Sequence, residues 1–309
     1  MTSGLAKNMR RFMTGVVVAL GGMLLATLAG TACVGYLDAD AGAADAEDGG
    51  AVEASFDGPG SPDGQGPTGE DGSGVDAGCD YGCVVLRDEP LVYLRFEDDV
   101  AATEARDSSE NQLHGSYPQA GASKGAPGIV PGTTAVQFTG VGPQGIRMPP
   151  SADFDGPRPK FSVELWLKPD RLDGMQFIVD HETFAPARGG WLVRTIDGRI
   201  GLELIKNDAH LGTAEAPVPL TVGQWQHVVL SYDDESATGL IWIDGKLVKT
   251  APMPPGGVSL VPTGEWSIGK QNCTPCQDFN FAGALDELAV YGRLLDQNIV
   301  DQHYRAARP

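Results

Sequence analysis

The chain has 309 residues, and its 41 Asp and Glu outnumber its 22 Lys and Arg, which gives a net charge of −19. So acidic a chain lacks the basic footprint that a phosphate backbone requires, which excludes nucleic acid as a partner. The 42 glycines and 22 prolines show no three-residue period, which excludes collagen. Their abundance favours an all-β or disordered chain over a helical bundle.

The N-terminal segment has the order of a secretory signal. Lys7, Arg10 and Arg11 form a positive region, and residues 12–32 then run without a charge. The stretch ends in LAGTAC, which resembles the lipobox of bacterial lipoproteins and places Cys33 for diacylation. We therefore expect residues 1–32 to be a lipoprotein signal peptide. The exported chain would be held by lipid at Cys33 in the cell membrane or outer membrane, facing the periplasm or the cell surface.

Two alternatives to lipidation remain open. The apolar segment is long enough to span a bilayer uncleaved, and an ordinary signal peptidase could cut after Ala32. Gly30 stands where a lipobox usually has an apolar residue. Lipidation is favoured because Cys33 lies where the apolar run ends and a flexible segment follows it.

Residues 33–78 are predicted to be a disordered tether that begins with the lipidated cysteine. Residues 34–78 hold 11 Asp and Glu, 12 Gly, 3 Pro and no Lys or Arg. Such a segment cannot bury enough apolar surface to offset chain entropy, and its like charges extend it. A calcium-binding repeat is the alternative, but the Asp-Gly steps follow no fixed spacing. Residues 79–309 then form one domain.

From residue 91 the sequence reads as short strands separated by turns. Segment 161–168 alternates, with Phe161, Val163, Leu165 and Leu167 on one face. Further strands are expected at 91–96, 135–138, 191–193, 200–204, 225–232, 240–243, 246–248, 266–269 and 284–291.

Turn and helix signals complete the pattern. Asp-Gly pairs at 197–198 and 244–245 lie between strands and predict type I′ hairpins. Only the tail, 295–307, looks helical, because Asp296 can cap it and Ile299, Val300, His303 and Tyr304 form a stripe. Many short strands without βαβ spacing predict an all-β, antiparallel two-sheet sandwich with a short C-terminal helix.

Five segments resemble, in the same order, those of LamG-like, concanavalin A-like jelly-roll domains. Segment 161–169, FSVELWLKP, is similar to the family's F-T-x-E-x-W-x-K-P strand. The others are GQWQHVV at 223–229, IWIDG at 241–245, GALDEL at 283–288 and the closing RLL…I…Y element at 293–304. The resemblance covers about residues 91–305.

The resemblance implies a jelly roll of two large antiparallel sheets and a non-catalytic module that binds a glycan or glycoconjugate. A protein-binding or structural envelope module is the alternative, and a glycoside hydrolase is the weaker third. The partner would be a glycan or a cell-surface protein, with the membrane reached through the lipid anchor. Because folds host many functions, this inference rests on analogy.

Individual residues give few ligand candidates. Trp191, beside Gly189-Gly190, is the best candidate for an exposed ring that stacks on a sugar. His227 lies between apolar residues in a strand, so we expect it to be a structural histidine. Asp180, His181 and Glu182 form a compact cluster that we expect in a solvated turn.

No catalytic motif is recognisable. Jelly-roll glycosidases of related families place Glu-x-Asp-x-(x)-Glu on one strand, so that the carboxylates flank the scissile bond. The only Glu-x-Asp here begins at Glu97, and Ala101 and Ala102 stand where the second Glu should be. We therefore expect the protein not to be an enzyme.

Four cysteines remain after Cys33. An even number in an exported chain predicts disulfides, with a Cys₄ zinc site as the alternative. The resemblance implies that the first strand lies antiparallel beside the last, which would separate the two cysteine pairs. It therefore implies the pairings Cys79–Cys83 and Cys273–Cys276.

The same strand pairing implies a structural calcium site. Segment 107–115, DSSENQLHG, resembles the family's D-x-S-G-N-x-x-x-G loop, and Asp286 comes from the G-x-I-D-E-V match. Asp107, Asn111 and Asp286 would supply oxygen ligands. Alternatively, Asp107 and Asn111 only form the turn, with Asp286 accepting hydrogen bonds from the backbone amides of these two residues.

Overall fold

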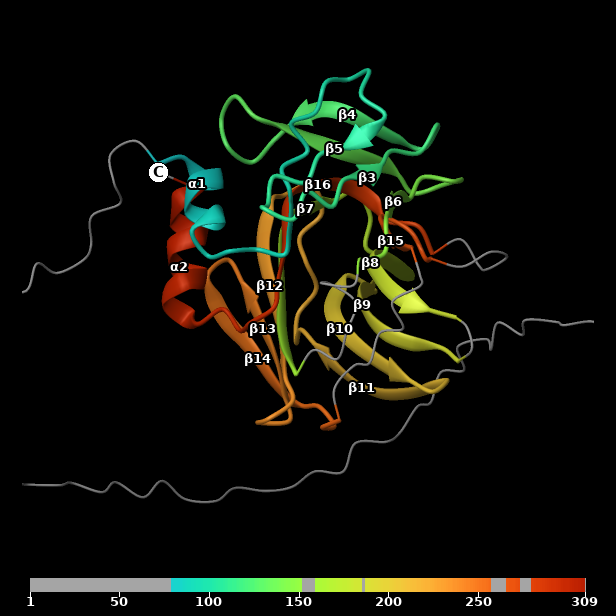
Figure 1. The fold of residues 1–309 in the computed structure, drawn as a ribbon, viewed down its shortest axis with the longest axis vertical. Coiled ribbons are helices and arrows are strands. Elements are labelled where there is room, and N and C mark those ends of the chain that lie inside the picture. The colour runs from blue at the N-terminus through green and yellow to red at the C-terminus, as the bar shows by residue number, and fades with distance from the viewer. Residues whose placement is uncertain (1–78, 152–158, 185–186, 257–264, 273–278, 309) are drawn as a thin grey trace, which may run out of the picture. The chain divides into compact units, whose positions relative to one another are not determined.

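The computed structural model describes residues 79–151, 159–184, 187–256, 265–272 and 279–308. These residues form two antiparallel sheets packed face to face, with two short helices (Figure 1). This arrangement confirms the predicted all-β sandwich. None of the described helices is long and apolar enough to cross a membrane.

The first sheet has eight strands in the order β14-β13-β12-β7-β16-β5-β4, with β1 paired to β16. Its strands are β1 (Val92–Leu94), β4 (Ala122–Pro127), β5 (Thr134–Thr139), β7 (Lys160–Pro169), β12 (Gln226–Asp233), β13 (Thr238–Ile243), β14 (Lys246–Pro252) and β16 (Ala282–Tyr291). The predicted pairing of the first strand with the last is confirmed, since Val92 lies opposite Val290.

The second sheet also has eight strands, in the order β11-β10-β9-β8-β15-β6-β3-β2. They are β2 (Glu104–Ala105), β3 (Gly115–Ser116), β6 (Ile146–Met148), β8 (Met175–Thr183), β9 (Gly189–Ile196), β10 (Arg199–Lys206), β11 (Ala209–Glu215) and β15 (Trp266–Ile268). All their named pairings are antiparallel.

The main core lies between the two sheets. Because side chains alternate along a strand, Phe161, Val163, Leu165 and Leu167 of β7 all point inward, as the sequence predicts. They meet Val193 of β9 and other apolar residues of the second sheet in one buried cluster.

Both Asp-Gly hairpins form where the sequence places them. Asp197 and Gly198 have φ values of 47° and 79°, and Asp244 and Gly245 have 50° and 77°. Type I′ turns require a positive φ at both central residues, which Asp tolerates and Gly adopts freely. The turns join β9 to β10 and β13 to β14.

Two helices cover the outer face of the first sheet. α1 (Tyr81–Leu86) was not expected from the sequence, whereas α2 (Gln297–Ala306) was. Asp296 caps α2 by accepting from the backbone N–H groups of Asn298 and Ile299. The helices pack on outward-facing Trp166, Trp242 and Tyr291 in a second buried cluster. Figure 1 shows α1 and α2 side by side, next to β12 and β13.

Candidate functional site

A polar groove lies on the outer face of the second sheet, along β6 and β15. The two strands pair with Ser267 opposite Arg147. Alternation sends Trp266 and Ile268 into the core, so Arg147 and Ser267 face outward. The lining residues include Arg147, Glu265, Ser267, Lys270, Gln271 and Asn272. The open face of this sheet therefore carries both hydrogen-bond donors and acceptors.

A turn after β15 builds one wall of the groove. Gly269 has a φ of 82°, and a Cβ there would lie 2.5 Å from Phe138 Cε1, so only glycine fits. The chain folds back, and Ser267 Oγ donates to the carbonyl oxygen of Lys270 at 2.6 Å. A Cβ on Gly145 would lie 3.2 Å from Lys270 Cβ, so the stem of this lysine lies close against Gly145.

The charges in the groove are partly paired. Arg147 Nη1 lies 3.5 Å from Glu265 Oε2, and the two side chains are 72% and 58% exposed. Lys270 has no carboxylate within ion-pair distance among the described residues. Of the described residues that line the groove, none is aromatic.

Asn272 connects the groove to a buried carboxyl pair. Its backbone N–H donates to Asp180 Oδ2 at 2.7 Å, and its side-chain Nδ2 donates to the carbonyl oxygens of Glu182 and Glu265. Because Nδ2 is held by two carbonyls, Asn272 Oδ1 is left to accept a hydrogen bond. Gln271 Oε1 is a buried acceptor that has no hydrogen-bond partner among the described residues, so a donor that reached it would stabilise it.

The carboxyl pair itself is a correction to the sequence interpretation. Asp180 and Glu182 lie on strand β8, 0% and 1% exposed, and not in a solvated turn. Burial and the neighbouring Glu182 raise the pKa of Asp180 well above its usual range. Burial also raises the pKa of Glu182, against the opposing charge of Arg188, whose Nε lies 2.9 Å from Glu182 Oε1. The carboxyl of Asp180 and the backbone carbonyl of Glu182 accept the hydrogen bonds that hold Asn272 in place.

Trp191 is not an exposed stacking ring, so that prediction is wrong. Its side chain is 3% exposed and belongs to the core between the sheets. Its ring lies 5.2 Å from that of Phe161 on the opposite sheet and stacks on His181 at 5.0 Å. The register of β9 gives Trp191 the inward face that Val193 shares, and Leu192 the outward one.

His227 is a structural histidine, as expected. It is fully buried, and its Nε2 lies 2.7 Å from Glu164 Oε1. Glu164 also lies 2.9 Å from His303 Nδ1 and accepts from the hydroxyl of Tyr291 at 2.6 Å. Burial opposes its charge, but the two histidines outweigh burial and hold the pKa of Glu164 well below its usual range. This cluster anchors α2 to β7.

The residues predicted to bind calcium serve other contacts. Asp107 accepts from the backbone N–H groups of Tyr93, Ser109 and Leu113 at 2.7–2.9 Å. Asn111 Nδ2 donates to the carbonyl oxygen of Leu91, and Asp286 Oδ2 accepts from the N–H of Ile129. The contacts of Asp107 agree with its role as a turn former, whereas Asp286 accepts from Ile129 and not from the amides of the 107–111 turn. Calcium binding itself stays an untested prediction.

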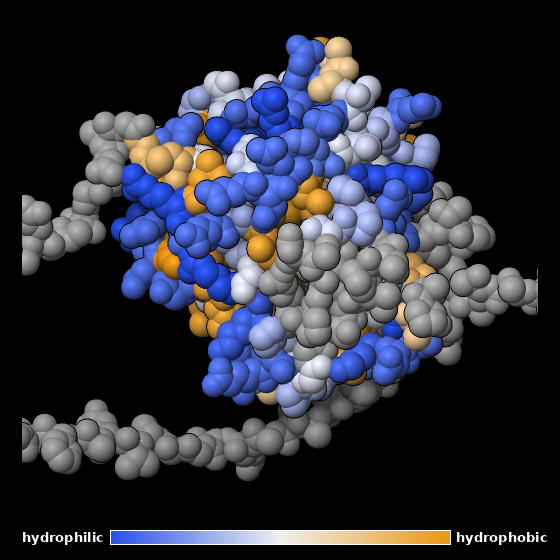
Figure 2. Space-filling model, in the orientation of Figure 1, coloured by the Kyte–Doolittle hydropathy of each residue, from blue (hydrophilic) through white to orange (hydrophobic). Residues whose placement is uncertain are grey.

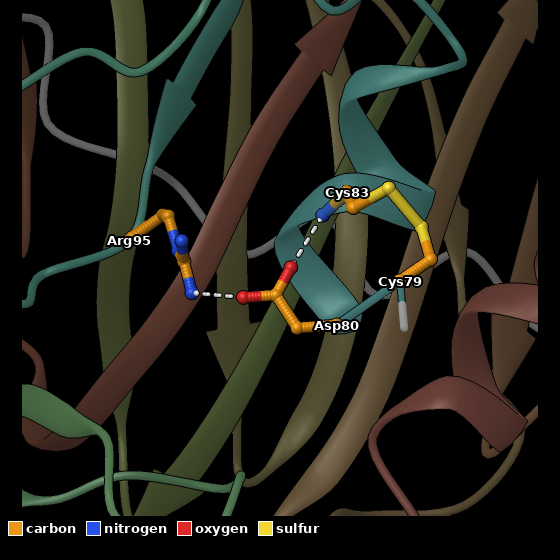
Figure 3. Close-up of a disulfide and its surroundings, with 4 residues drawn as sticks. All are labelled: Cys79, Asp80, Cys83 and Arg95. Carbon is orange, nitrogen blue, oxygen red and sulfur yellow. Dashed lines mark hydrogen bonds and ion pairs between the residues drawn. A yellow bond between two sulfur atoms is a disulfide. The ribbon is translucent and has the colours of Figure 1, made fainter. Parts of the chain in front are cut away.

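Of the cysteines, Cys79 and Cys83 lie within the described residues. The structure joins them by a disulfide with a Cα–Cα distance of 5.4 Å, the pairing that was predicted (Figure 3). Asp80 between them caps α1 through the N–H of Cys83 and pairs with Arg95. Cys33, Cys273 and Cys276 lie outside the described residues.

Sequence reasoning missed the groove residues altogether. Arg147 lies in the short segment IRM, and Lys270, Gln271 and Asn272 follow the glycine that ends β15. The alternation of IRM indicates that Arg147 faces away from the core. Nothing local shows that β6 pairs with β15, and this pairing is what brings the two segments together.

Comparison with known proteins agrees with this architecture. The family described as the concanavalin A-like lectin/glucanases superfamily matches residues 142–301. No curated protein matches the chain.

Three solved structures illustrate the proteins that share this fold. The binding domain of Paraclostridial Mosquitocidal Protein 1 has a TM-score of 0.56 and 13% identity, over 71% of this chain and 52% of that one. A structure of botulinum neurotoxin type C, whose cell entry depends on interaction with two ganglioside molecules, has a TM-score of 0.53 and 13% identity, over 73% of this chain and 53% of that one.

The third is domain 4 of AbnA, an extracellular arabinanase from Geobacillus stearothermophilus, in complex with arabinotriose. It has a TM-score of 0.52 and 19% identity, over 70% of this chain and 98% of that one. The chain spans only about half the length of the toxin structures. At sequence identities of 13% and 19%, the similarity between this chain and these structures shows the fold alone.

Proposed function

The chain belongs to the concanavalin A-like lectin/glucanase superfamily, and from this premise we propose that it is a non-catalytic module that recognises a glycan or glycoconjugate. The groove on the second sheet is the binding site. Arg147, Gln271 and Asn272 bind sugar hydroxyls there, with Glu265 as an acceptor.

The observation that carries the proposal is the contrast between the two outer faces. The first sheet has its outer face covered by α1 and α2, whereas the second presents a groove lined by polar side chains. Sugar hydroxyls both donate and accept hydrogen bonds, so a site that binds them needs donors and acceptors close together. In Figure 2 the described residues of the visible face are mostly hydrophilic, with separate small hydrophobic areas. The polar lining of the groove favours a polar ligand over a flat apolar partner.

The structural neighbours give further support. Domain 4 of AbnA is in complex with arabinotriose, and botulinum neurotoxin type C interacts with two ganglioside molecules. Binding in place of hydrolysis is proposed because Asp180 and Glu182, the carboxyls that share a strand beside the groove, are buried and held by Asn272 and Arg188. Retaining and inverting glycosidases both require two carboxyls that reach the sugar.

The module is proposed to act outside the cytoplasm. The charge pattern of residues 1–32 and the lipobox-like LAGTAC support export and lipidation at Cys33. The acidic, glycine-rich segment 34–78 would then serve as the spacer between the lipid and the domain.

A glycan array probed with the purified full chain tests the proposal. We expect binding to a restricted set of glycans and its loss in the variant Arg147→Ala/Gln271→Ala. Lys246→Ala, at an exposed position on β14 of the other sheet, is the control and should keep the wild-type pattern. An array without any glycan signal for folded protein would overturn the proposal and favour a protein-binding envelope module.

A further inference from the structure

We propose that the ligand of the groove is an anionic sugar, one whose carboxylate or sulfate group is bound by Lys270 and Arg147. This inference rests on the proposed glycan recognition and assigns the ligand its charge. It comes from three features of the groove: a cation that has no ion-pair partner among the described residues, a second cation that solvent can reach, and a wall that holds the first in place.

The first cation is Lys270. The chain has almost twice as many acidic as basic residues, yet no carboxylate among the described residues lies within ion-pair distance of this ammonium group. A lysine that lines a groove and has no counter-ion among the described residues attracts an anion, because those residues leave its charge uncancelled. An acidic protein gains selectivity in this way, since the rest of its surface repels anions.

The second cation, Arg147, is only weakly engaged. Its distance of 3.5 Å to Glu265 and the exposure of both side chains describe a surface ion pair, a kind that contributes little to stability. A carboxylate or sulfate on the ligand matches the planar guanidinium with two parallel hydrogen bonds. Glu265 is then released to accept a hydrogen bond from a hydroxyl group of the same sugar.

The wall keeps Lys270 in place. Ser267 Oγ holds its carbonyl oxygen at 2.6 Å, and its stem lies against Gly145. Two residues further on, the N–H of Asn272 is bound by the buried Asp180 at 2.7 Å. Because the backbone on both sides of Lys270 is fixed, little backbone entropy is lost when an anion binds.

Matched pairs of sugars that differ only in charge test the inference. The full chain is titrated by calorimetry with an oligogalacturonate and with its methyl ester, and with a sulfated oligosaccharide and its desulfated form. We expect at least one anionic form to bind about tenfold more tightly than its neutral partner, as hydrogen bonds to a charged group are worth more than neutral ones. The preferred pair identifies carboxylate or sulfate as the group that is bound.

Variants of Lys270 test whether the preference for the anionic sugar arises in the groove. Lys270→Gln should remove most of the preference for the anionic sugar, and Lys270→Arg should restore it. Lys249→Gln, at an exposed position of β14, removes the same charge from the other sheet and should leave the preference unchanged. Melting curves check that each variant is folded.

The outcomes separate the two proposals. Equal binding of the charged and neutral forms, or a preference that survives Lys270→Gln, overturns the anionic ligand while glycan recognition stands. If neither these sugars nor any glycan on the array binds, glycan recognition itself fails, and the inference fails with it.

Discussion

His303 on α2 and Glu164 on β7 are 139 residues apart in the sequence and form a fully buried ion pair, with His303 Nδ1 2.9 Å from Glu164 Oε2. The other ring nitrogen of His303 lies 2.9 Å from Asp88 Oδ2, just after α1. One imidazole therefore links both helices to the first sheet.

Removing the charge of Glu164 should destabilise the fold strongly. We expect Glu164→Gln to lower the free energy of unfolding by about 3–5 kcal/mol, because the buried His303 would keep only Asp88 as a carboxylate partner and the buried His227 would lose its own. Urea unfolding measures this loss. Asp301→Asn is the control, since it breaks an exposed pair with Arg305 on the same helix and should cost less than about 0.5 kcal/mol. Equal losses for the two variants would contradict the prediction.

The His303 pair should also make stability depend on pH. Burial lowers the pKa of His303, but the charge of Glu164 and the hydrogen bonds to Asp88 and Glu164 outweigh burial and raise it to about 9. Since histidine titrates near 6.5 when unfolded, the pair stabilises the fold fully below pH 6.5 and loses that contribution as the pH rises through 9. Glu164 itself stays ionised over this range.

The measurement compares wild type with His303→Gln by urea unfolding at several pH values. The difference between their unfolding free energies should shrink from pH 6.5 to above 9. The other groups around the imidazole, His227, Tyr291 and Arg293, are present in both proteins. A difference that stays constant or grows over this range would show that the pair does not titrate as described.

Asp286 should make the stability of the fold change with pH in the opposite direction to an ordinary surface carboxylate. Burial raises the pKa of its carboxyl to about 7, against the hydrogen bond from Ile129. The folded chain then retains a proton that the unfolded chain releases near pH 4, so wild-type stability falls as the pH rises from 4 to 7. Asp286→Asn cannot titrate and keeps an acceptor for Ile129.

The stability of Asp286→Asn relative to wild type should therefore rise between pH 5 and pH 8. Glu287, whose pKa burial and Asp286 raise to about 9, and the nearby Arg95 and Glu97 are present in both proteins. Thermal unfolding across this range measures the effect. A relative stability that does not change with pH would be incompatible with a raised pKa at Asp286.

Loss of the Cys79–Cys83 disulfide should loosen α1. The helix has only six residues, too few to be stable in isolation. For so short a loop, the chain-entropy model gives a loss of about 2 kcal/mol as an upper value. We expect Cys79→Ser/Cys83→Ser to melt at a lower temperature than wild type under oxidising conditions. A reducing agent should lower the wild-type melting temperature by a larger amount than that of the variant.

Lipidation at Cys33 is tested through processing in a bacterial host. Cys33→Ser should leave an unprocessed precursor, because a serine cannot accept the diacylglycerol thioether that precedes cleavage. Immunoblots of membrane fractions distinguish precursor from mature protein. Normal maturation and membrane retention of Cys33→Ser would rule out the lipobox interpretation and favour ordinary signal cleavage or an uncleaved anchor.

The fold could be predicted because its signals are local. Alternation along 161–168 shows which side chains enter the core, Asp-Gly pairs specify hairpins, and Asp296 caps α2. The orientation of Trp191 was predicted wrongly because glycine neighbours do not reveal which face of a strand is buried. That face follows from the register with β8, where Trp191 lies opposite His181. Arg147 and Lys270 could not be placed in one groove, since pairing between distant strands leaves no trace in either segment.

The covering helices have a consequence for how the domain is held. Residues 79 and 308 adjoin α1 and α2, which pack on the first sheet, whereas the groove opens on the opposite side of the sandwich. A partner fused directly to residue 79 or residue 308 would therefore begin on the side of the sandwich away from the groove. Tension between a tethered residue 79 and a ligand in the groove would cross both sheets, and the Cys79–Cys83 bridge would be the first cross-link to bear that load.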